Sequence, residues 1–242
     1  ANIGLNYVVS DLKHTNLNLI NRDIKSTGIS GLVISNLNFP SNIVTNRKLG
    51  SSSTGASLVS EKSDVLVVQY KPNLVGGYDC EGNKVEKTDE VIVQRYFLRL
   101  DTNGTGSDLA LACDAGRYTA TATAITGLND KDDKGGQIIM QRVDQFKVMV
   151  GVQNTQTRKM SYMTLSQFGD VLITDNLRAV SLQIGLLVRS LDNSGTNTKE
   201  KTTYRLLNTN QKVEKPKGMN AKFLRIPVEQ TIALKNGLGE RL

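Results

Sequence analysis

The chain of 242 residues has few side chains suited to nucleophilic catalysis: one histidine, His14, and two cysteines, Cys80 and Cys113. A serine or cysteine nucleophile needs an imidazole within hydrogen-bonding reach. His14 falls on the polar face of a predicted helix, so we expect it to be solvated. No two carboxylates stand out as a buried acid–base pair, although a glycosidase-like pair formed only in the folded chain stays open. We therefore predict a protein that is not an enzyme, with no catalytic residue and no small-molecule substrate.

Two aspartate-rich loops, residues 101–108 and 129–134, have the recurring oxygen-bearing side chains that a calcium site needs. The first loop lacks the bidentate glutamate that closes a twelve-residue calcium loop. The second contains Lys131 and Lys134, which would repel a cation. A structural zinc site would need two good ligands beyond the two cysteines. We expect solvated turns with no metal and no cofactor, and calcium binding stays an open alternative.

Cys80 and Cys113 each lie in a turn-rich stretch next to a predicted strand. We predict a disulfide between them, which favours an oxidising compartment such as a periplasm or a cell surface. On the chain-entropy model, a cross-link of this kind stabilises the fold by about 3–4 kcal/mol. The alternative is a pair of unbonded thiols in a cytosolic protein.

Positive charge is concentrated near the C-terminal end. The net charge is +7, and the residues from Lys199 onward, with 10 basic and 4 acidic side chains, account for +6 of it. Such a region can attract nucleic acid or an anionic surface by charge alone. Tyr204 and Phe223 are too few aromatics for a base-stacking platform, so a solvated loop is the first interpretation. The candidate anion or DNA contacts are Lys212, Lys215, Lys217, Lys222 and Arg225.

The first predicted element of the fold is an N-terminal amphipathic helix over residues 1–28, which carries His14. Asn16 interrupts its apolar stripe, so part of the helix must face solvent or a polar partner. Gly28 suits the left-handed residue that ends a helix. The apolar side chains recur every three or four residues and are expected to divide between packing on the sheet and contacting neighbouring subunits: Leu5, Val8, Leu12, Ile20 and Ile24.

After Gly31 the helical period gives way to short β-branched runs separated by Gly, Asn, Asp and Ser. No run approaches the roughly 20 apolar residues that span a bilayer. The predicted fold class is α+β, with the N-terminal helix packed on an antiparallel β-sheet or sandwich. We predict two parts, residues 1–30 and a single β-rich globular domain over residues 31–242. The expected strands lie near residues 64–70, 91–100, 108–113, 117–125, 137–152, 177–190, 202–207 and 221–234.

Four stretches occur in a characteristic order: residues 21–28 (NRDIKSTG), residues 64–70 and 79–82 (DVLVVQY and DCEG), residues 177–190 (LRAVSLQIGLLVRS) and residues 231–236 (TIALKN). Together they resemble the PilW-type minor pilins of type IV pili, which are related to the J-type pseudopilins of type II secretion. The likeness extends over about residues 10–236. It implies a pilin-like fold in which residues 1–30 form the C-terminal half of a longer N-terminal helix.

The resemblance implies a minor pilin, a structural subunit of a priming and tip complex needed for pilus assembly, adhesion and twitching motility. Its implied partners are other minor pilins and the major pilin. It also implies an anchor in the bacterial inner membrane through an apolar helix half upstream of Ala1, which we expect to be a processed or truncated start. The implied location is the inner membrane and periplasm before assembly, and the pilus tip at the cell surface afterwards. Two alternatives stay open: a J-type pseudopilin, and a tip module that binds DNA or a surface through the basic C-terminal face.

Overall fold

The structure is a computed structural model, and it describes residues 2–21, 23–45, 49–102, 107–129, 134–171, 175–193, 200–215 and 221–234. Antiparallel strands dominate these residues. The helices are short: α1 (Asn2–Leu12), α2 (Leu165–Gly169) and a turn of 3-10 helix at Asn36–Asn38. The α+β class predicted from the sequence is confirmed in this coarse form.

The first sheet contains five antiparallel strands in the order β1-β2-β3-β4-β5. Every residue of β2 is buried, which suits its nearly continuous run of Val and Leu, because a strand covered on both faces needs no polar side. The strands are β1 (Ser52–Gly55), β2 (Ser63–Tyr70), β3 (Val91–Leu100), β4 (Leu109–Tyr118) and β5 (Gln137–Gln141).

The second sheet contains four antiparallel strands in the order β11-β8-β6-β7. Its longest strand, β8, has 17 residues and pairs with β6 on one side and with β11 on the other. A hairpin of β9 and β10 packs on this sheet through Tyr204 and Leu206. The strands are β6 (Val143–Asn154), β7 (Met160–Thr164), β8 (Leu177–Asn193), β9 (Thr203–Leu206), β10 (Thr209–Lys212) and β11 (Phe223–Ala233).

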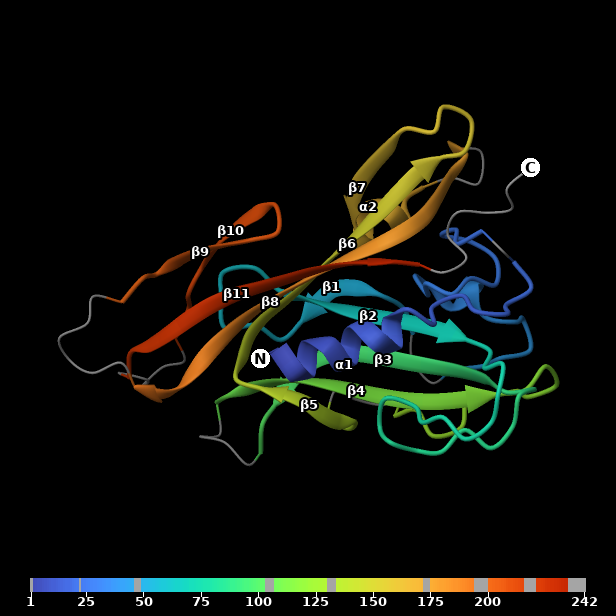
Figure 1. Ribbon diagram of the computed structural model, residues 1–242, viewed down its shortest axis with the longest axis horizontal. Helices are drawn as coiled ribbons and strands as arrows, with labels where there is room; N and C mark the ends of the chain where they lie inside the picture. Colours follow the sequence, from blue (N-terminus) through green and yellow to red (C-terminus); the bar gives the residue numbers. More distant parts are fainter. Residues whose placement is uncertain are drawn as a thin grey trace.

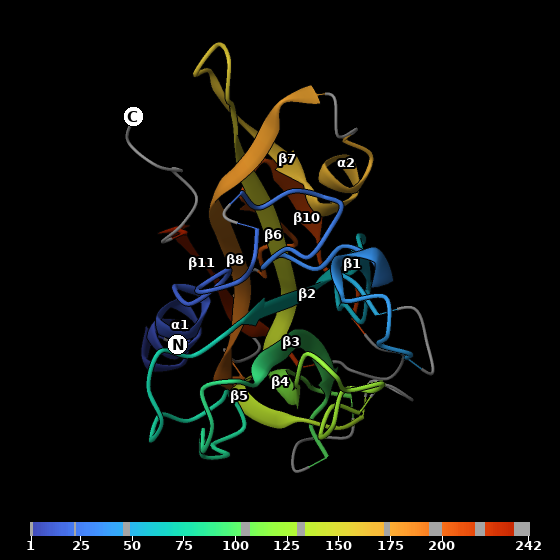
Figure 2. The same ribbon diagram turned by 90° about the vertical axis from the view of Figure 1, so that its right-hand side faces the viewer.

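The two sheets and α1 share one hydrophobic core. Large members of this core are Tyr96 of β3 and Phe146 of β6, both fully buried. Figure 1 shows α1 in front of the strands of the first sheet and below β11, and Figure 2, turned by 90°, shows it at one side of the molecule. The helix contacts β5 and β11, which are outer strands of the two sheets among the described residues. It therefore lies across the opening between the sheets.

Helix α1 ends at Leu12, so the predicted helix over residues 1–28 is wrong beyond that point. Asn16 and Asn18 have φ angles of 67° and 51°, in the left-handed region that interrupts an α-helix. The side-chain oxygen of Asn16 accepts a hydrogen bond from the N–H of Gly31 at 2.7 Å, and the backbone N–H of Asn16 donates to the carbonyl oxygen of Gln69 at 3.0 Å. Because asparagine can satisfy nearby backbone groups in this way, it competes with the helix.

The early end of α1 changes the placement of two predicted packing residues. Ile20 is 85% exposed, so it does not pack on the sheet, and its contact with a neighbouring subunit stays a prediction. Ile24 is buried, but it belongs to an isolated bridge in which its carbonyl accepts a hydrogen bond from Ala179 of β8 at 2.8 Å. Gly28 does adopt a positive φ of 73°, in a bend rather than at a helix end.

Candidate assembly interface

Helix α1 buries one face in the core. Leu5, Val8 and Leu12 follow the helical period and are 5%, 0% and 0% exposed. They join the core that both sheets build, whereas Asn6 and Ser10 are exposed. Full burial of each such apolar side chain contributes about 1.5–3 kcal/mol. The helix is thus held mainly by its apolar stripe, and three of the five predicted stripe residues lie on it.

Gly4 allows α1 to approach β5 closely. A Cβ atom on Gly4 would lie 3.0 Å from Cε of Met140 and 3.2 Å from the carbonyl oxygen of Ile139. The second of these neighbours is backbone, which cannot swing aside as a flexible side chain can. A larger residue at this position would push the first turn of the helix away from the strand.

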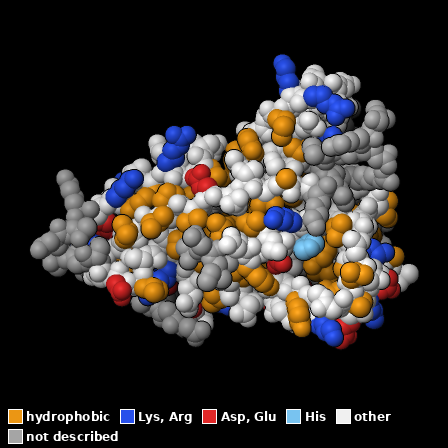
Figure 3. Space-filling model, viewed as in Figure 1, with side chains coloured by type: hydrophobic (Ala, Val, Ile, Leu, Met, Phe, Trp, Pro, Cys, Tyr) orange, Lys and Arg blue, Asp and Glu red, His pale blue; other side chains and the backbone are white. Residues whose placement is uncertain are grey.

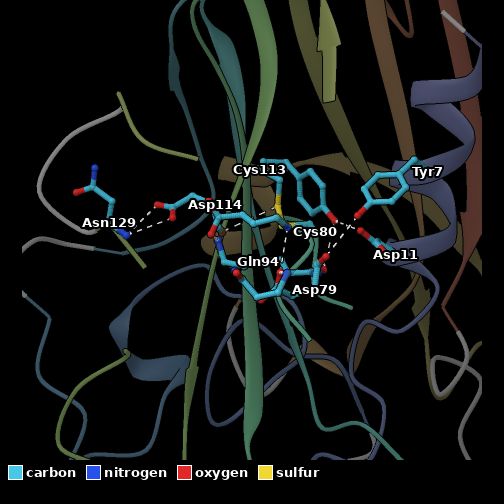
Figure 4. Close-up of a disulfide and its surroundings, with 12 residues drawn as sticks. Tyr7, Asp11, Asp79, Cys80, Gln94, Cys113, Asp114 and Asn129 are labelled. Carbon is cyan, nitrogen blue, oxygen red and sulfur yellow. Dashed lines mark hydrogen bonds between the residues drawn. A yellow bond between two sulfur atoms is a disulfide. The ribbon is translucent and has the colours of Figure 1, made fainter. Parts of the chain in front are cut away.

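A disulfide lies next to the helix, as Figure 4 shows. Cys80 follows β2 and Cys113 belongs to β4; they are bonded, with their Cα atoms 6.0 Å apart. Both are buried, and the predicted pairing is confirmed. The Tyr7 hydroxyl of α1 donates a hydrogen bond to the carbonyl oxygen of Asp79 at 3.3 Å. The disulfide-bonded loop is therefore tied to β4 on one side and to α1 on the other.

Asp79 organises the turn that carries Cys80. Its Oδ1 accepts hydrogen bonds from the backbone N–H groups of Glu81 at 3.1 Å and Asn83 at 2.9 Å. Its Oδ2 pairs with Arg117 of β4 at 2.8 Å. Gly82 has a φ of 85°, which glycine adopts at little cost. The Asp-Cys-Glu-Gly stretch is thus a turn in which the aspartate accepts the backbone N–H groups and the glycine adopts the positive φ angle.

Asp11 is a half-buried carboxyl group on the side of α1 that meets the first sheet. The hydroxyl of Tyr96 on β3 lies 3.2 Å from Asp11 Oδ2 and 3.2 Å from Gln94 Oε1. Burial raises the pKa of Asp11 to about 6, while the hydrogen bond from Tyr96 lowers that pKa and the charge of Asp79 raises it. Asp11 therefore gains or loses its proton at a pH just below neutral. This carboxyl group contacts Tyr96 where the helix meets the sheet.

A buried group of charges joins three strands of the second sheet to the residue that precedes β4 of the first sheet. Asp144 of β6 lies 2.6 Å from Nε of Arg225 on β11 and 3.4 Å from Nε of Arg189 on β8. Arg189 also pairs with Asp108, which precedes β4. Burial raises the pKa of Asp144, and the two arginines act in the opposite direction. We call the following set the ion cluster: Asp108, Asp144, Arg189, Glu200, Lys215 and Arg225.

One feature of the sequence indicates the ion cluster. Asp144, Arg189 and Arg225 interrupt apolar strands at positions where a solvated charge is not expected. Buried charges are normally paired, so these residues had to meet one another or other ions. Their partners depend on how the strands are paired, which the sequence pattern does not specify.

A family model described as "Type IV Pilus-assembly protein W" (PilW) matches residues 95–236, more than half of the chain. The chain belongs to the PilW family. This confirms the resemblance drawn from the sequence. No curated protein matches the chain. Among solved structures, a type IV-like pilin from Thermus thermophilus is similar, with 16% sequence identity, a TM-score of 0.46, and coverage of 97% of this chain and 95% of that one.

The PilW match extends from β3 to just beyond β11. It includes all six residues of the ion cluster and Cys113, but neither α1 nor Cys80. The place of α1 between the two sheets therefore comes from the structure and is independent of the family match. The described part of this PilW chain contains no helix of sufficient length and apolar character to span a membrane.

Two of the predicted anion contacts of the PilW chain are held inside the ion cluster. Arg225 is 4% exposed and lies 2.8 Å from Glu200 as well as 2.6 Å from Asp144. Lys215 lies 2.5 Å from Glu200. The prediction that Arg225 offers its charge to DNA is therefore wrong, because its guanidinium is buried and paired with two carboxylates. Lys217 lies outside the described residues, while Lys212 is exposed on β10.

The remaining chemical candidates can be placed only in part. His14 lies 5.4 Å from Tyr70, ring centre to ring centre, beside a surface cavity of about 410 Å³. Asp101 accepts a hydrogen bond from Gln141 at 2.9 Å. Residues 103–106 and 130–133, which form most of the two aspartate-rich loops, are outside the described residues. Elsewhere in the described chain, no three His, Cys, Asp or Glu side chains are grouped for a metal ion.

Proposed function

We propose that the chain is a minor pilin, a structural subunit that joins a type IV pilus as part of a priming and tip complex. The match to the PilW family over residues 95–236 is the observation that supports this most strongly. The seat of α1 also supports it, since an amphipathic helix at the opening between two sheets is well placed to join a subunit to its neighbours. The partners would be other minor pilins and the major pilin.

The finer architecture belongs to the same proposal. We take the two sheets as a pilin-like sandwich, and their common core supports this interpretation. The division into residues 1–30 and one globular domain over residues 31–242 stays a prediction. An anchor in the inner membrane before assembly and a position at the pilus tip afterwards follow from the proposed role. The buried disulfide suits the oxidising periplasm that such a route crosses.

A structural role without catalysis is the most economical account of the described residues. Their buried charges pair with one another across strands, and their buried cysteines are bonded. Both features stabilise the fold and leave the outer surface to make contacts. The proposal therefore assigns the protein to assembly rather than to turnover of a substrate.

Deletion of the gene tests the proposal. We expect surface pili, counted by electron microscopy, to disappear or fall sharply, and the wild-type gene to restore them. Normal piliation with normal secretion in the deletion strain would refute the proposed function. Normal piliation with failure of exoprotein secretion would identify a J-type pseudopilin instead.

Two variants of α1 test whether restoration of pili in the deletion strain depends on the buried face of the helix. Val8→Asp places a charge in the core where Val8 is fully buried, so this variant should fail to restore pili. Asn6→Asp introduces the same charge on the exposed side of the same helix, so it should restore pili as well as the wild type does. Full restoration of pili by both variants would show that the packing of α1 on the sheets does not matter for assembly.

A further inference from the structure

The surface cavity beside His14 has a volume of about 410 Å³, which is typical of sites for small ligands. One wall is the segment that follows α1, with His14 and Leu17. The other wall is the loop that follows β2, with Leu74, Val75 and Tyr78. Figure 3 shows the histidine, in pale blue, next to a group of apolar side chains. We call this hollow the His14 cavity.

The rim of the His14 cavity is apolar and open to solvent. Leu74, Val75 and Tyr78 are 80%, 58% and 63% exposed, and they lie in one short loop. Apolar side chains grouped in this way on a soluble domain are typical of binding sites. Among the described residues, no charged side chain lines the cavity. Because a charged group buried there would lose water without gaining an ionic partner, the part of a ligand that enters should be neutral.

Tyr70, the last residue of β2, brings a hydroxyl group to the lining of the cavity. This side chain is only 7% exposed, yet its hydroxyl forms no hydrogen bond with a described residue. A buried phenol normally has a hydrogen-bond partner. Burial, together with the charges of Asp11 and Asp79, raises the pKa of Tyr70, so the hydroxyl stays protonated and able to donate. A ligand in the cavity can supply the missing acceptor.

Aromatic rings make up part of the cavity wall. The ring centres of His14 and Tyr70 are 5.4 Å apart, and the ring planes are inclined by 32°. Aromatic rings attract one another at such distances in offset and tilted arrangements. Tyr78 adds a third ring at the rim. An aromatic ligand would therefore gain ring contacts in addition to the burial of apolar surface.

Backbone hydrogen bonds hold the two walls together. The N–H of Lys71 donates to the carbonyl oxygen of Leu17 at 2.9 Å, which joins one wall to the other. Within the loop, the N–H of Gly76 donates to the carbonyl oxygen of Val85 at 2.8 Å. The disulfide at Cys80 ties the same loop to β4. The cavity is thus formed before a ligand arrives, which lowers the entropy cost of binding.

We propose that the His14 cavity binds a neutral phenolic ring, which packs against the rings of His14 and Tyr78 and forms a hydrogen bond with the hydroxyl of Tyr70. The ring belongs either to a free phenolic molecule or to an exposed tyrosine of another protein, since both present the same chemical group. This binding site goes beyond the proposed function and does not depend on it.

The single histidine allows a direct test, because its ring gives one set of NMR signals at the wall of the cavity. The probe is N-acetyl-tyrosinamide, added to the 242-residue chain at constant pH. We expect the His14 ring signals to shift and to reach saturation. N-acetyl-phenylalaninamide lacks the hydroxyl and should bind about threefold or more weakly.

A third probe separates the two sources of the ring. p-Cresol is the tyrosine side chain without its backbone. If p-cresol binds as tightly as N-acetyl-tyrosinamide, the result supports a free phenolic ligand. If it binds more weakly, the backbone adds contacts, and the result supports a tyrosine of another protein.

Three variants localise the binding. Tyr70→Phe keeps the ring and removes the hydroxyl, so it should bind the tyrosine and phenylalanine amides equally. Tyr78→Ala removes a ring from the rim and should weaken the binding of both amides by about threefold or more. Tyr162→Ala is the matched control, because Tyr162 is a 47% exposed tyrosine on β7, and it should bind as the wild type does.

Any of four results would overturn the inference. No probe shifts the His14 signals, N-acetyl-leucinamide binds as tightly as the tyrosine amide, Tyr70→Phe keeps the preference for the tyrosine amide, or Tyr78→Ala binds as tightly as Tyr162→Ala. The last comparison holds even if Tyr70→Phe is unstable. Tyr78 and Tyr162 are both exposed, so the melting temperatures of their variants should match that of the wild type.

Discussion

The hydroxyl of Tyr96 on β3 lies 3.2 Å from the carboxyl group of Asp11 on α1 and equally far from Gln94 Oε1. A phenol has one hydrogen to donate, so a charged Asp11 and the amide oxygen of Gln94 compete for it. A protonated Asp11 removes the competition, because its own O–H donates to Tyr96 and the Tyr96 hydrogen goes to Gln94. Burial favours the neutral form of Asp11 at this junction, and the hydrogen bond that Tyr96 donates favours the charged form.

Asp11 should make the stability of the fold depend on pH. The pKa of this group is raised from 3.8 to about 6, so the folded state favours the protonated form. Its stabilising effect is full below about pH 4 and is lost as the pH rises through about 6. Asp11→Asn should raise the free energy of unfolding at about pH 7.5 by about 1–3 kcal/mol and flatten its decline above pH 4. Urea unfolding at several pH values measures both effects.

Asp89→Asn is the control for this change, because Asp89 is exposed in the loop before β3. Its free energy of unfolding should follow that of the wild type at every pH. If Asp11→Asn and Asp89→Asn have the same effect, the carboxyl group of Asp11 is not the source of the pH dependence.

The disulfide should contribute a large share of the stability. Replacing Cys80 and Cys113 with serine should lower the free energy of unfolding by about 3–4 kcal/mol, because the unfolded chain loses a constraint between two residues at a sequence separation of 33. Thiol labelling of the unreduced wild type should remain near zero even after unfolding. Reduction should destabilise the wild type and leave the double variant unchanged. Labelling of two thiols in the unfolded, unreduced chain would contradict the bond.

Arg225 should be needed for folding rather than for binding an anion. Arg225→Met leaves Asp144 buried with one of its two arginine partners removed. Breaking a buried ion pair from one side costs about 3–5 kcal/mol. Chemical denaturation measures this loss, and adding Asp144→Asn should recover part of it. Lys212→Met, on the exposed surface of β10, should change stability by no more than about 0.5 kcal/mol. Similar small effects of both substitutions would show that the ion cluster contributes little.

Local patterns in the sequence predicted the elements that depend on near neighbours. The spacing of Leu5, Val8 and Leu12 predicted a helix with one buried face, and the structure places all three in the core. The strand at residues 64–70 was recognisable from its continuous apolar run and is β2. The two cysteines left few alternatives to a disulfide.

The ion cluster could not be predicted, because its residues are far apart in the sequence. Asp144, Arg189 and Arg225 meet only when β6, β8 and β11 pair in the observed register, and a shift of one residue would turn these side chains to the opposite face. The position at which α1 ends also depends on residues that are distant in the sequence. The contacts that bend the chain at Asn16 come from Gly31 and Gln69, which no helical period reveals.

The end of α1 can be tested with two residues that the sequence places on one stripe. Leu12 is 0% exposed and Ile20 is 85% exposed, although a single long helix would give both a similar setting. Leu12→Asp buries an unpaired charge and should cost about 3 kcal/mol or more. Ile20→Asp adds the same charge in solvent and should change the free energy of unfolding by less than about 0.5 kcal/mol. Urea denaturation of the two variants compares them directly. Because the substitutions are chemically alike, equal losses could arise only if Ile20 is buried, which would contradict a helix that ends at Leu12.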